Sequence, residues 1–569
     1  MWTARQWARV AGATAAIGLG AAAPTAPQEA LAVSWYRTVP EVVRLDAADP
    51  VRIEVAVTGT PDHAQFIFAP DSVPTAPGAV TYELRDDGRD ADQRAGDGVY
   101  SVALPAATLL SGASSADANR RLSGFLTLTR GTTTVGPAQL QVPFIDASIP
   151  AVEVTRLAAD VQVSAHVVNI HDPGFMASSD YGRAYRRFYD FFDDDYYGIN
   201  VVTLPSRFQN RFGGALQSDA TGIGLDGVAL NPMTGSGGGL FHMSAFPLLY
   251  YFDGAETGAI HELGHQWINY AKAVPALAAG APHWPVSSLA GGVMGYGSGG
   301  GEGLSFPCTV TEETQGLRMT PRKTQPVFTD FDLYLMGLLL ASSVTADALV
   351  LPITNTTAST CTGALYTGAW QRVSIGDVVR TLGPRVPAAG VARTRFRIAT
   401  VVVSRDGLVD ADTMAWLDYF SSRMAGTEPV PTHAGFVKAT GYPFAVATRG
   451  LGSIDASVTP RSSVDFLQTV SPSRLEMSPA AQARFTVHLE SRNGTFTAPV
   501  SFECLTSIPV PRACSFDPPV AVPGASGADV TVTLSGALTN NWLNGAYSFA
   551  VRATSGDRRH TTGADLVVK

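Results

Sequence analysis

Two histidines and a glutamate in GAIHELGHQWINY, residues 258–270, have the types and spacing of a metal site that carries its own base. On a helix, His261 and His265 lie one turn apart on the same face, so both imidazoles can reach one ion. Glu262 is rotated by about 100° from His261 and can take a proton from a water molecule activated by the metal. The alternative is an amphipathic helix that carries two histidines by chance. The spacing favours zinc.

The same helix must also contribute to a core. Ile260, Leu263 and Trp267 fall on other parts of its surface and are expected to pack inward. Gly264 weakens the helix by about 1 kcal/mol, a cost that makes sense if another group approaches closely there.

Catalytic zinc usually takes three protein ligands and a water molecule, so a third ligand must come from elsewhere. The pattern HExxHxxGxxH is not continued, because Ile268 and Ala271 occupy its glycine and last histidine positions. His283, in APHWPV, follows after a loop long enough to fold back on the helix, and it is the predicted third ligand. Asp332, in FDLYLMGL, is the alternative, and Glu302 is a weaker one. Asp332 could instead stabilise a helix N-terminus or bond to a ligand histidine.

The elements that would position this motif indicate an α+β core between two β-rich regions. Residues 155–455 mix helical patterns, such as 180–198 and 410–426, with strand-like runs. Residues 33–150 and 460–569 consist of short β-rich runs separated by turn residues. We therefore expect N-terminal and C-terminal β-sandwich domains on either side of the catalytic region.

Composition and the N-terminal residues indicate where the protein acts and which partners it lacks. Residues 1–32 have the arginines, short apolar run and small residues of an export signal, which could be cut after residue 23 or 32. The net charge of −9 and the lack of a basic cluster argue against nucleic acid, and no later apolar run is long enough for membrane insertion. In a secreted protein, extracellular or periplasmic, four cysteines suggest two disulfides, and proximity favours Cys308–Cys361 and Cys504–Cys514.

The motifs HELGHQW, PHW, GGVMGY and DFDLYLMGL, in this order across about residues 160–345, resemble those of exported bacterial HExxH zinc metallopeptidases of the zincin type. This resemblance implies a zincin fold and a metal-dependent hydrolase. VMGY is also similar to the Met-turn of astacin-like and serralysin-like metzincins. That similarity implies that Met294 forms the floor of the site and that the Tyr296 hydroxyl steadies the oxyanion. A glycine-rich loop with incidental Met294 and Tyr296 is the alternative.

Two further segments resemble parts of secreted β modules. DDGRDADQRAGDGVYS, residues 86–101, is similar to a loop of bacterial β-sandwich modules, and Asp86, Asp90 and Asp97 could hold Ca²⁺. A plain Asp/Gly turn is the alternative. ECLTSIPVPRACSFDPPV, residues 503–520, resembles the cysteine-containing hairpin of bacterial immunoglobulin-like modules.

These observations predict a secreted zinc metalloendopeptidase that acts on a protein or peptide substrate. Two rivals stay open: another zinc hydrolase on the same scaffold, and an exported adhesin whose β modules bind a surface or matrix ligand. The sequence has no GxSxG motif, which would supply the nucleophile of a serine hydrolase. The acidic run DFFDDDYY could supply glycosidase carboxylates or simply face solvent. Whether residues 33–150 are a removable pro-segment is also open.

Overall fold

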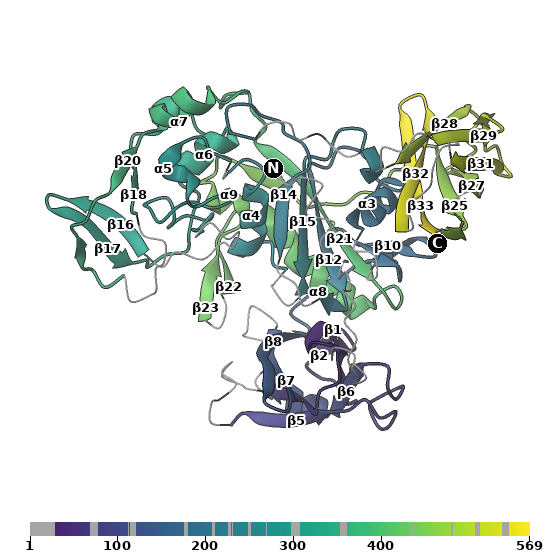
Figure 1. Cartoon of the computed structure of the whole chain (residues 1–569), viewed down its shortest axis with the longest axis horizontal. Coiled ribbons are helices and arrows are strands. Elements are labelled where there is room, and N and C mark those ends of the chain that lie inside the picture. Colours follow the sequence, from purple (N-terminus) through teal and green to yellow (C-terminus); the bar gives the residue numbers. More distant parts are fainter. Residues whose placement is uncertain are drawn as a thin grey trace, which may run out of the picture.

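The computed structural model describes residues 29–569 except 69–74, 76–77, 112, 114–120, 176–179, 208–210, 226–228, 230–231, 249–251, 269, 298–307, 353–360, 435–436, 479–481, 507–511 and 537–544. The predicted export signal therefore lies outside the described residues except for its last four, and Ala32 already begins strand β1. Helices and sheets are mixed and strands predominate, in agreement with the predicted α+β class. Three sheet-bearing regions can be distinguished (Figure 1).

The N-terminal region consists of two sheets around one apolar core. The first sheet contains β1 (Ala32–Val39), β3 (Val51–Thr58), β6 (Val99–Leu104) and β13 (Ser206–Arg207). The second contains β2 (Val43–Arg44), β4 (His63–Phe68), β5 (Val80–Leu84), β7 (Arg121–Arg130) and β8 (Thr133–Ile145), and the short helix α1 (Ala106–Leu109) follows β6. Alternating residues such as Val55 and Phe66 fill the core. The turn-separated β-rich runs of residues 33–150 thus fold as strands.

The central region is built on an eight-stranded sheet. Its strands in order are β14 (Phe212–Ala215), β15 (His242–Pro247), β12 (Gly198–Leu204), β21 (Arg395–Ser404), β11 (Val167–His171), β10 (Val161–Val163) and β9 (Thr155–Ala158), and β24 (Ser453–Asp455) also pairs with β21. The four strands from β15 to β11 run parallel, whereas β14 is an antiparallel edge strand with Gly213 opposite Ser244. All of β12 is buried, because helices cover both faces of the sheet.

The two faces of this sheet carry different helices. Helix α3 (Tyr181–Tyr189) packs against Ile199 and Val201, together with Val401 of β21. Helix α8 (Ala411–Ser422), capped by Asp410, packs on the opposite face against Val202. The other helices are α4 (Thr257–Gly264), α5 (Pro275–Ala278), α6 (Asp330–Met336), α7 (Ile375–Leu382) and α9 (Phe444–Ala447). Residues of these other helices share a core with Phe396 and Ile398 of β21. Both side chains lie on the same face of the sheet as Val402, so these helices lie on the side covered by α8.

Smaller elements complete the central region. They are β16 (Cys308–Glu313), β17 (Gly316–Pro321), β18 (Ala348–Val350), β19 (Leu365–Tyr366), β20 (Gln371–Val373), β22 (Val430–Ala434) and β23 (Val437–Gly441), with the 3-10 turns η1 (Pro232–Thr234), η3 (Ala341–Ser343) and η5 (Arg423–Ala425). The predicted disulfide Cys308–Cys361 is confirmed, and it ties β16 to the segment before β19.

The helix predicted over residues 180–198 is shorter than expected, because α3 ends at Tyr189. The acidic run that follows is held in a turn by its own contacts. Asp194 accepts hydrogen bonds from the Ser236 hydroxyl (2.6 Å) and from the N–H groups of Gly237 and Gly239. Its neighbours on either side form ion pairs with Arg461 (2.7 Å) and Arg397 (2.5 Å). These contacts favour a structural role for the acidic run over a pair of glycosidase carboxylates.

The C-terminal region again consists of two sheets around one core. One contains β25 (Asp465–Ser471), β27 (Gln482–Arg492), β29 (Arg512–Asp517) and β31 (Ala528–Gly536). The other contains β26 (Arg474–Met477), β28 (Val500–Thr506), β30 (Val520–Ala521), β32 (Gly545–Ser555) and β33 (Arg558–Val568). The predicted disulfide Cys504–Cys514 is confirmed. The expected cysteine hairpin is wrong, because β28 and β29 belong to different sheets and the disulfide joins the two.

The C-terminal region is joined to the central region by a buried polar cluster. The Arg461 guanidinium donates to the Phe192 carbonyl (2.7 Å) and pairs with both Asp193 and Asp465. His560, fully buried on β33, lies 3.0 Å from Asp465 through Nε2. Strand β33 also packs on α3, where Arg186 lies close to Gly563. We call these contacts the C-terminal latch.

The N-terminal region is joined to the central region in a similar way. Strand β13, which lies between β12 and β14 in the sequence, pairs with β1 and extends the N-terminal sheet. Arg121 of β7 donates to the Phe252 carbonyl (2.9 Å), and its guanidinium carbon lies 5.1 Å from the ring centre of Trp416 in α8. Within the described part of the chain, no helix combines the length and apolar character needed to cross a membrane.

Candidate metal centre

Helix α4 carries His261, and His265 is the residue that directly follows it, so the helix is shorter than the sequence suggests. It ends at Gly264. The next turn is closed by hydrogen bonds between residues three apart in the sequence, as in a 3-10 helix, such as the bond from the His265 N–H to the Glu262 carbonyl (3.2 Å). No side chain caps its N-terminus, so its stability comes from packing. Ile260, Leu263 and Trp267 enter the core shared with α6 and α9, as predicted.

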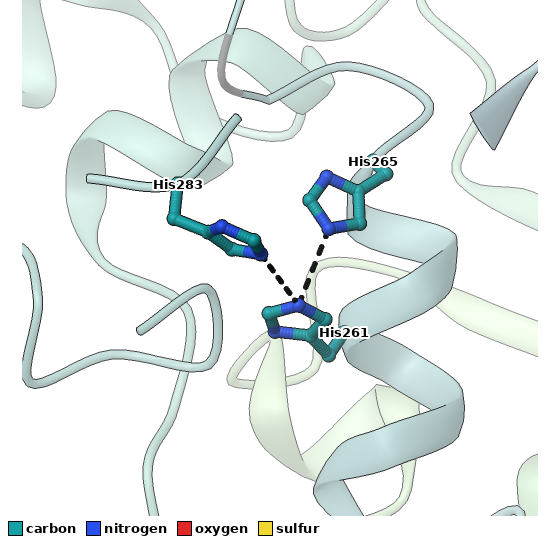
Figure 2. Close-up of side chains that lie close together, drawn as sticks. All are labelled: His261, His265 and His283. Carbon is teal, nitrogen blue, oxygen red and sulfur yellow. Dashed lines mark hydrogen bonds between the residues drawn. The ribbon is translucent and has the colours of Figure 1, made fainter. Parts of the chain in front are cut away.

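Three histidines converge beside this helix (Figure 2). The Nε2 atom of His261 lies 3.2 Å from Nε2 of His265 and 3.2 Å from Nε2 of His283. All three side chains are buried, and His283 comes from the loop after α5. Tetrahedral zinc with three nitrogen ligands would separate the nitrogen atoms by about 3.3 Å. The spacing therefore fits one small cation bound by all three.

The hydrogen bonding of these rings favours a cation over mutual hydrogen bonds. His261 Nδ1 lies 2.9 Å from the Val293 carbonyl, which can only accept, so this nitrogen carries the proton and Nε2 presents a lone pair. The other two rings could then donate only to that single lone pair. One lone pair cannot accept two such bonds fully, so mutual hydrogen bonds would leave one N–H poorly satisfied. A metal ion instead accepts one lone pair from each ring.

The histidines are held neutral, which a metal ligand requires. Burial, followed by the positive charge of Arg211, lowers the pKa of His261 to about 3 and that of His283 to about 4. The pKa of His265 lies well below its usual range, again because of burial and then because of its two histidine neighbours. At neutral pH all three imidazoles therefore offer lone pairs.

Glu262 is buried beside the histidines but outside their cluster. Burial raises the pKa of this carboxyl, and the Arg211 guanidinium opposes the shift by donating from Nε to Oε1 at 3.0 Å. Edge strand β14 lies directly over it: a side chain at Gly213 would come within 2.7 Å of the Glu262 Cβ. Arg211 is a site residue that the sequence analysis missed, because its contact depends on how β14 packs on α4 and no local pattern signals it.

The segment Val293–Gly297 contacts His261, His283 and the end of α4. The Val293 carbonyl orients His261, and Gly297 packs against the His283 ring. Met294 lies under the helix, where a Cβ at Gly264 would collide with its sulfur atom. This contact explains why glycine occupies position 264. Tyr296 is buried in an apolar cluster with Cys308, and its backbone bridges to Trp284, the residue after His283.

Asp332, the predicted alternative to His283 as third ligand, makes structural hydrogen bonds instead. Its Oδ1 accepts a hydrogen bond from Trp284 Nε1 (2.8 Å), and its Oδ2 accepts one from the Thr329 N–H (2.8 Å) in a capping box. It is fully buried, and burial raises its pKa to about 6. It is not part of the histidine cluster. Asp332 therefore holds Trp284, next to His283. Glu302 lies outside the described residues.

The predicted calcium loop brings together Asp86, Asp92 and Asp97, whereas Asp90 is not part of the group. Asp90 instead adopts a left-handed backbone conformation in the turn. Asp86 accepts hydrogen bonds from the N–H groups of Gly96, Asp97 and Gly98. Asp92 accepts from the Gly88 and Arg94 N–H groups. The carboxylates could hold a cation, but these bonds already account for the loop as an Asp/Gly turn.

In comparisons with known proteins, no family model and no curated protein matched this chain. What the chain does must therefore be inferred from the chemistry of its own residues.

Proposed function

We propose that the chain is a secreted zinc-dependent metalloendopeptidase with a zincin-type core. The observation that carries this proposal is the convergence of three neutral, buried imidazole nitrogens beside the buried carboxylate of Glu262. The resemblance of HELGHQW and its companion motifs to zincin metallopeptidases supports it, as does the antiparallel edge strand β14 over α4. Two disulfides are typical of proteins that leave a reducing compartment.

In this proposal, His261, His265 and His283 hold the ion. Zinc bound there would supply Lewis acidity to a water molecule and to a peptide carbonyl. Glu262 accepts a proton from the attacking water and returns it to the leaving amine. Burial raises the pKa of Glu262, which strengthens it as a base, while the Arg211 charge works against complete loss of the ionised form. Met294 supports the helix from below. Tyr296 is the proposed donor to the oxyanion.

The proposal is tested by elemental analysis and a digestion assay on the purified full chain. We expect about one zinc per chain and cleavage of casein or gelatin. The Glu262→Gln variant should retain the zinc and lose at least about 100-fold in rate, because it removes only the base. If the wild type binds no zinc when zinc is supplied, the metallopeptidase proposal fails. If it binds zinc and cleaves only non-peptide substrates, the chain is another zinc hydrolase.

A further inference from the structure

Arg211 is the cation next to the candidate metal centre. It directly precedes β14, and its guanidinium lies against the start of α4, where a Cβ at Gly258 would be 3.5 Å from its Cζ and Nε. Its Nε donates to Glu262 Oε1 at 3.0 Å. The Glu262 side chain is only 6% exposed, whereas that of Arg211 is 35% exposed. The arginine thus reaches from solvent to the base.

This ion pair occupies only part of the guanidinium. Arginine presents five N–H donors, and a carboxylate bound at Nε leaves the outer edge, with both Nη atoms, for a second planar acceptor. Within the described part of the chain, Glu262 is the one acidic residue that forms an ion pair with Arg211. A two-pronged carboxylate is the group that best fits such an edge.

The charge balance of the site points the same way. Histidines bind a metal ion as neutral ligands, and Glu262 and Arg211 cancel each other, so a divalent ion held by the three histidines would leave the site with two uncompensated positive charges. Among the described residues, no other carboxylate joins the metal cluster. A substrate that brought its own negative charge would therefore be favoured over a neutral one.

We propose that Arg211 determines specificity by binding a substrate carboxylate adjacent to the scissile bond. This inference rests on the proposed metallopeptidase function and names its substrate class: peptides with an acidic side chain next to the cleaved bond, or with a free terminal carboxylate there. Arg211 remains paired with Glu262 through Nε while its outer edge receives the substrate. The arginine is thus both a tether for the base and a recognition group.

The test compares zinc-loaded wild type with Arg211→Gln and Arg211→Lys on matched peptides. One pair of peptides differs by Glu or Gln beside the scissile bond, and a second pair has a free acid or an amide at the C-terminus, so the two sources of carboxylate are separated. In one of these pairs, wild type should prefer the acidic peptide by about tenfold in kcat/KM, mainly through KM. Arg211→Gln should lose this preference, and Arg211→Lys should keep part of it.

Binding provides a second readout that does not depend on turnover. Short peptide hydroxamates with a terminal carboxylate or carboxamide are titrated into each zinc-loaded variant, after zinc content and melting temperature have confirmed that each is folded. Wild type should bind the carboxylate compound more tightly than the amide. Arg211→Gln should bind the carboxylate compound no more tightly than the amide. Equal binding of both compounds to wild type, together with no preference for the acidic member of either peptide pair, would overturn the role of Arg211 while leaving the metallopeptidase proposal intact. Failure of wild type to hold zinc or either hydroxamate would overturn the metallopeptidase proposal itself.

Discussion

At the scale of single residues, the site depends on which nitrogen atoms carry protons. The Val293 carbonyl fixes the tautomer of His261, and this leaves a single lone pair for the two neighbouring rings. Neither fact can be obtained from the sequence, which reveals only that two histidines share a helix face. The sequence already favoured His283 over Asp332 as the third ligand, and the fold adds that His283 lies in the cluster whereas Asp332 bonds to Trp284 and Thr329.

Zinc content therefore distinguishes the two candidate ligands. His283→Ala should lower zinc from about one per chain to a small fraction after dialysis, because two imidazoles remain. Asp332→Ala should keep its zinc but lower the free energy of unfolding by about 2–3 kcal/mol, since it leaves the buried Trp284 N–H unpaired. Elemental analysis and urea unfolding measure the two effects. Loss of zinc in Asp332→Ala with no loss of stability would reverse the assignment.

A pH effect is expected at His242, a fully buried histidine on β15 outside the ligand set. Burial lowers its pKa to about 3, so the unfolded chain binds a proton between pH 3 and 6.5 that the folded chain does not. Its contribution to stability is complete above about pH 6.5 and is lost as the pH falls, by about 1.4 kcal/mol per pH unit.

The metal-free wild type and the His242→Gln variant should therefore converge in stability on acidification. Urea unfolding of both proteins from pH 7 to pH 5 measures the difference in the free energy of unfolding. A difference that stays constant across this range would show that His242 is not held neutral by the fold.

At the scale of elements, the sequence predicted which segments form helices better than where those helices end. Helix α4 stops at Gly264 and α3 stops at Tyr189, in each case because a tertiary contact takes over: Met294 beneath the first, and the bonds of Asp194 after the second. Helix α8 was predicted closely because Asp410 caps it locally. Strand β14 and Arg211 were missed, since FGGA has no apolar alternation and its role comes from its partner strand.

The contact between α4 and Met294 can be tested by a double-mutant cycle. Gly264→Ala should lower the free energy of unfolding by about 1–2 kcal/mol, because overpacking against the sulfur atom outweighs the gain in helix propensity. In a Met294→Ala background the same change should be neutral or stabilising. Chemical unfolding of the four metal-free proteins gives the coupling, which we expect to exceed about 1 kcal/mol. Simple additivity would mean that the two residues do not meet.

The Cys308–Cys361 disulfide also stabilises the surroundings of the histidine cluster, because both cysteines pack in the apolar cluster that contains Tyr296. It closes a loop with a sequence separation of 53. Replacing both cysteines with serine should cost about 4 kcal/mol by the loop-entropy relation and speed the release of zinc to a chelator. The matched control replaces Cys504 and Cys514, which join the distant C-terminal sheets, and it should leave the release rate unchanged.

At the scale of the whole molecule, the N-terminal region is an integral part of the fold. Its sheet is extended by β13 from the central region, and Arg121 stacks on Trp416 of α8. Removing residues 1–150 should therefore expose α8, lower the melting temperature and increase cleavage by trypsin around residues 405–425. Calorimetry and limited proteolysis measure these changes. A fragment 151–569 that melts like the full chain would instead identify the region as a removable pro-segment.

The C-terminal latch has a consequence for geometry. Arg461 contacts Phe192 and Asp193 in the turn after α3, and β33, which carries His560, packs on α3 itself, so the last β-sandwich is fixed directly to the central region. A molecule bound by the sandwich would consequently be held at a constant distance and orientation relative to the three histidines. For the proposed peptidase, this arrangement would restrict cleavage to bonds at one set distance from the point of attachment.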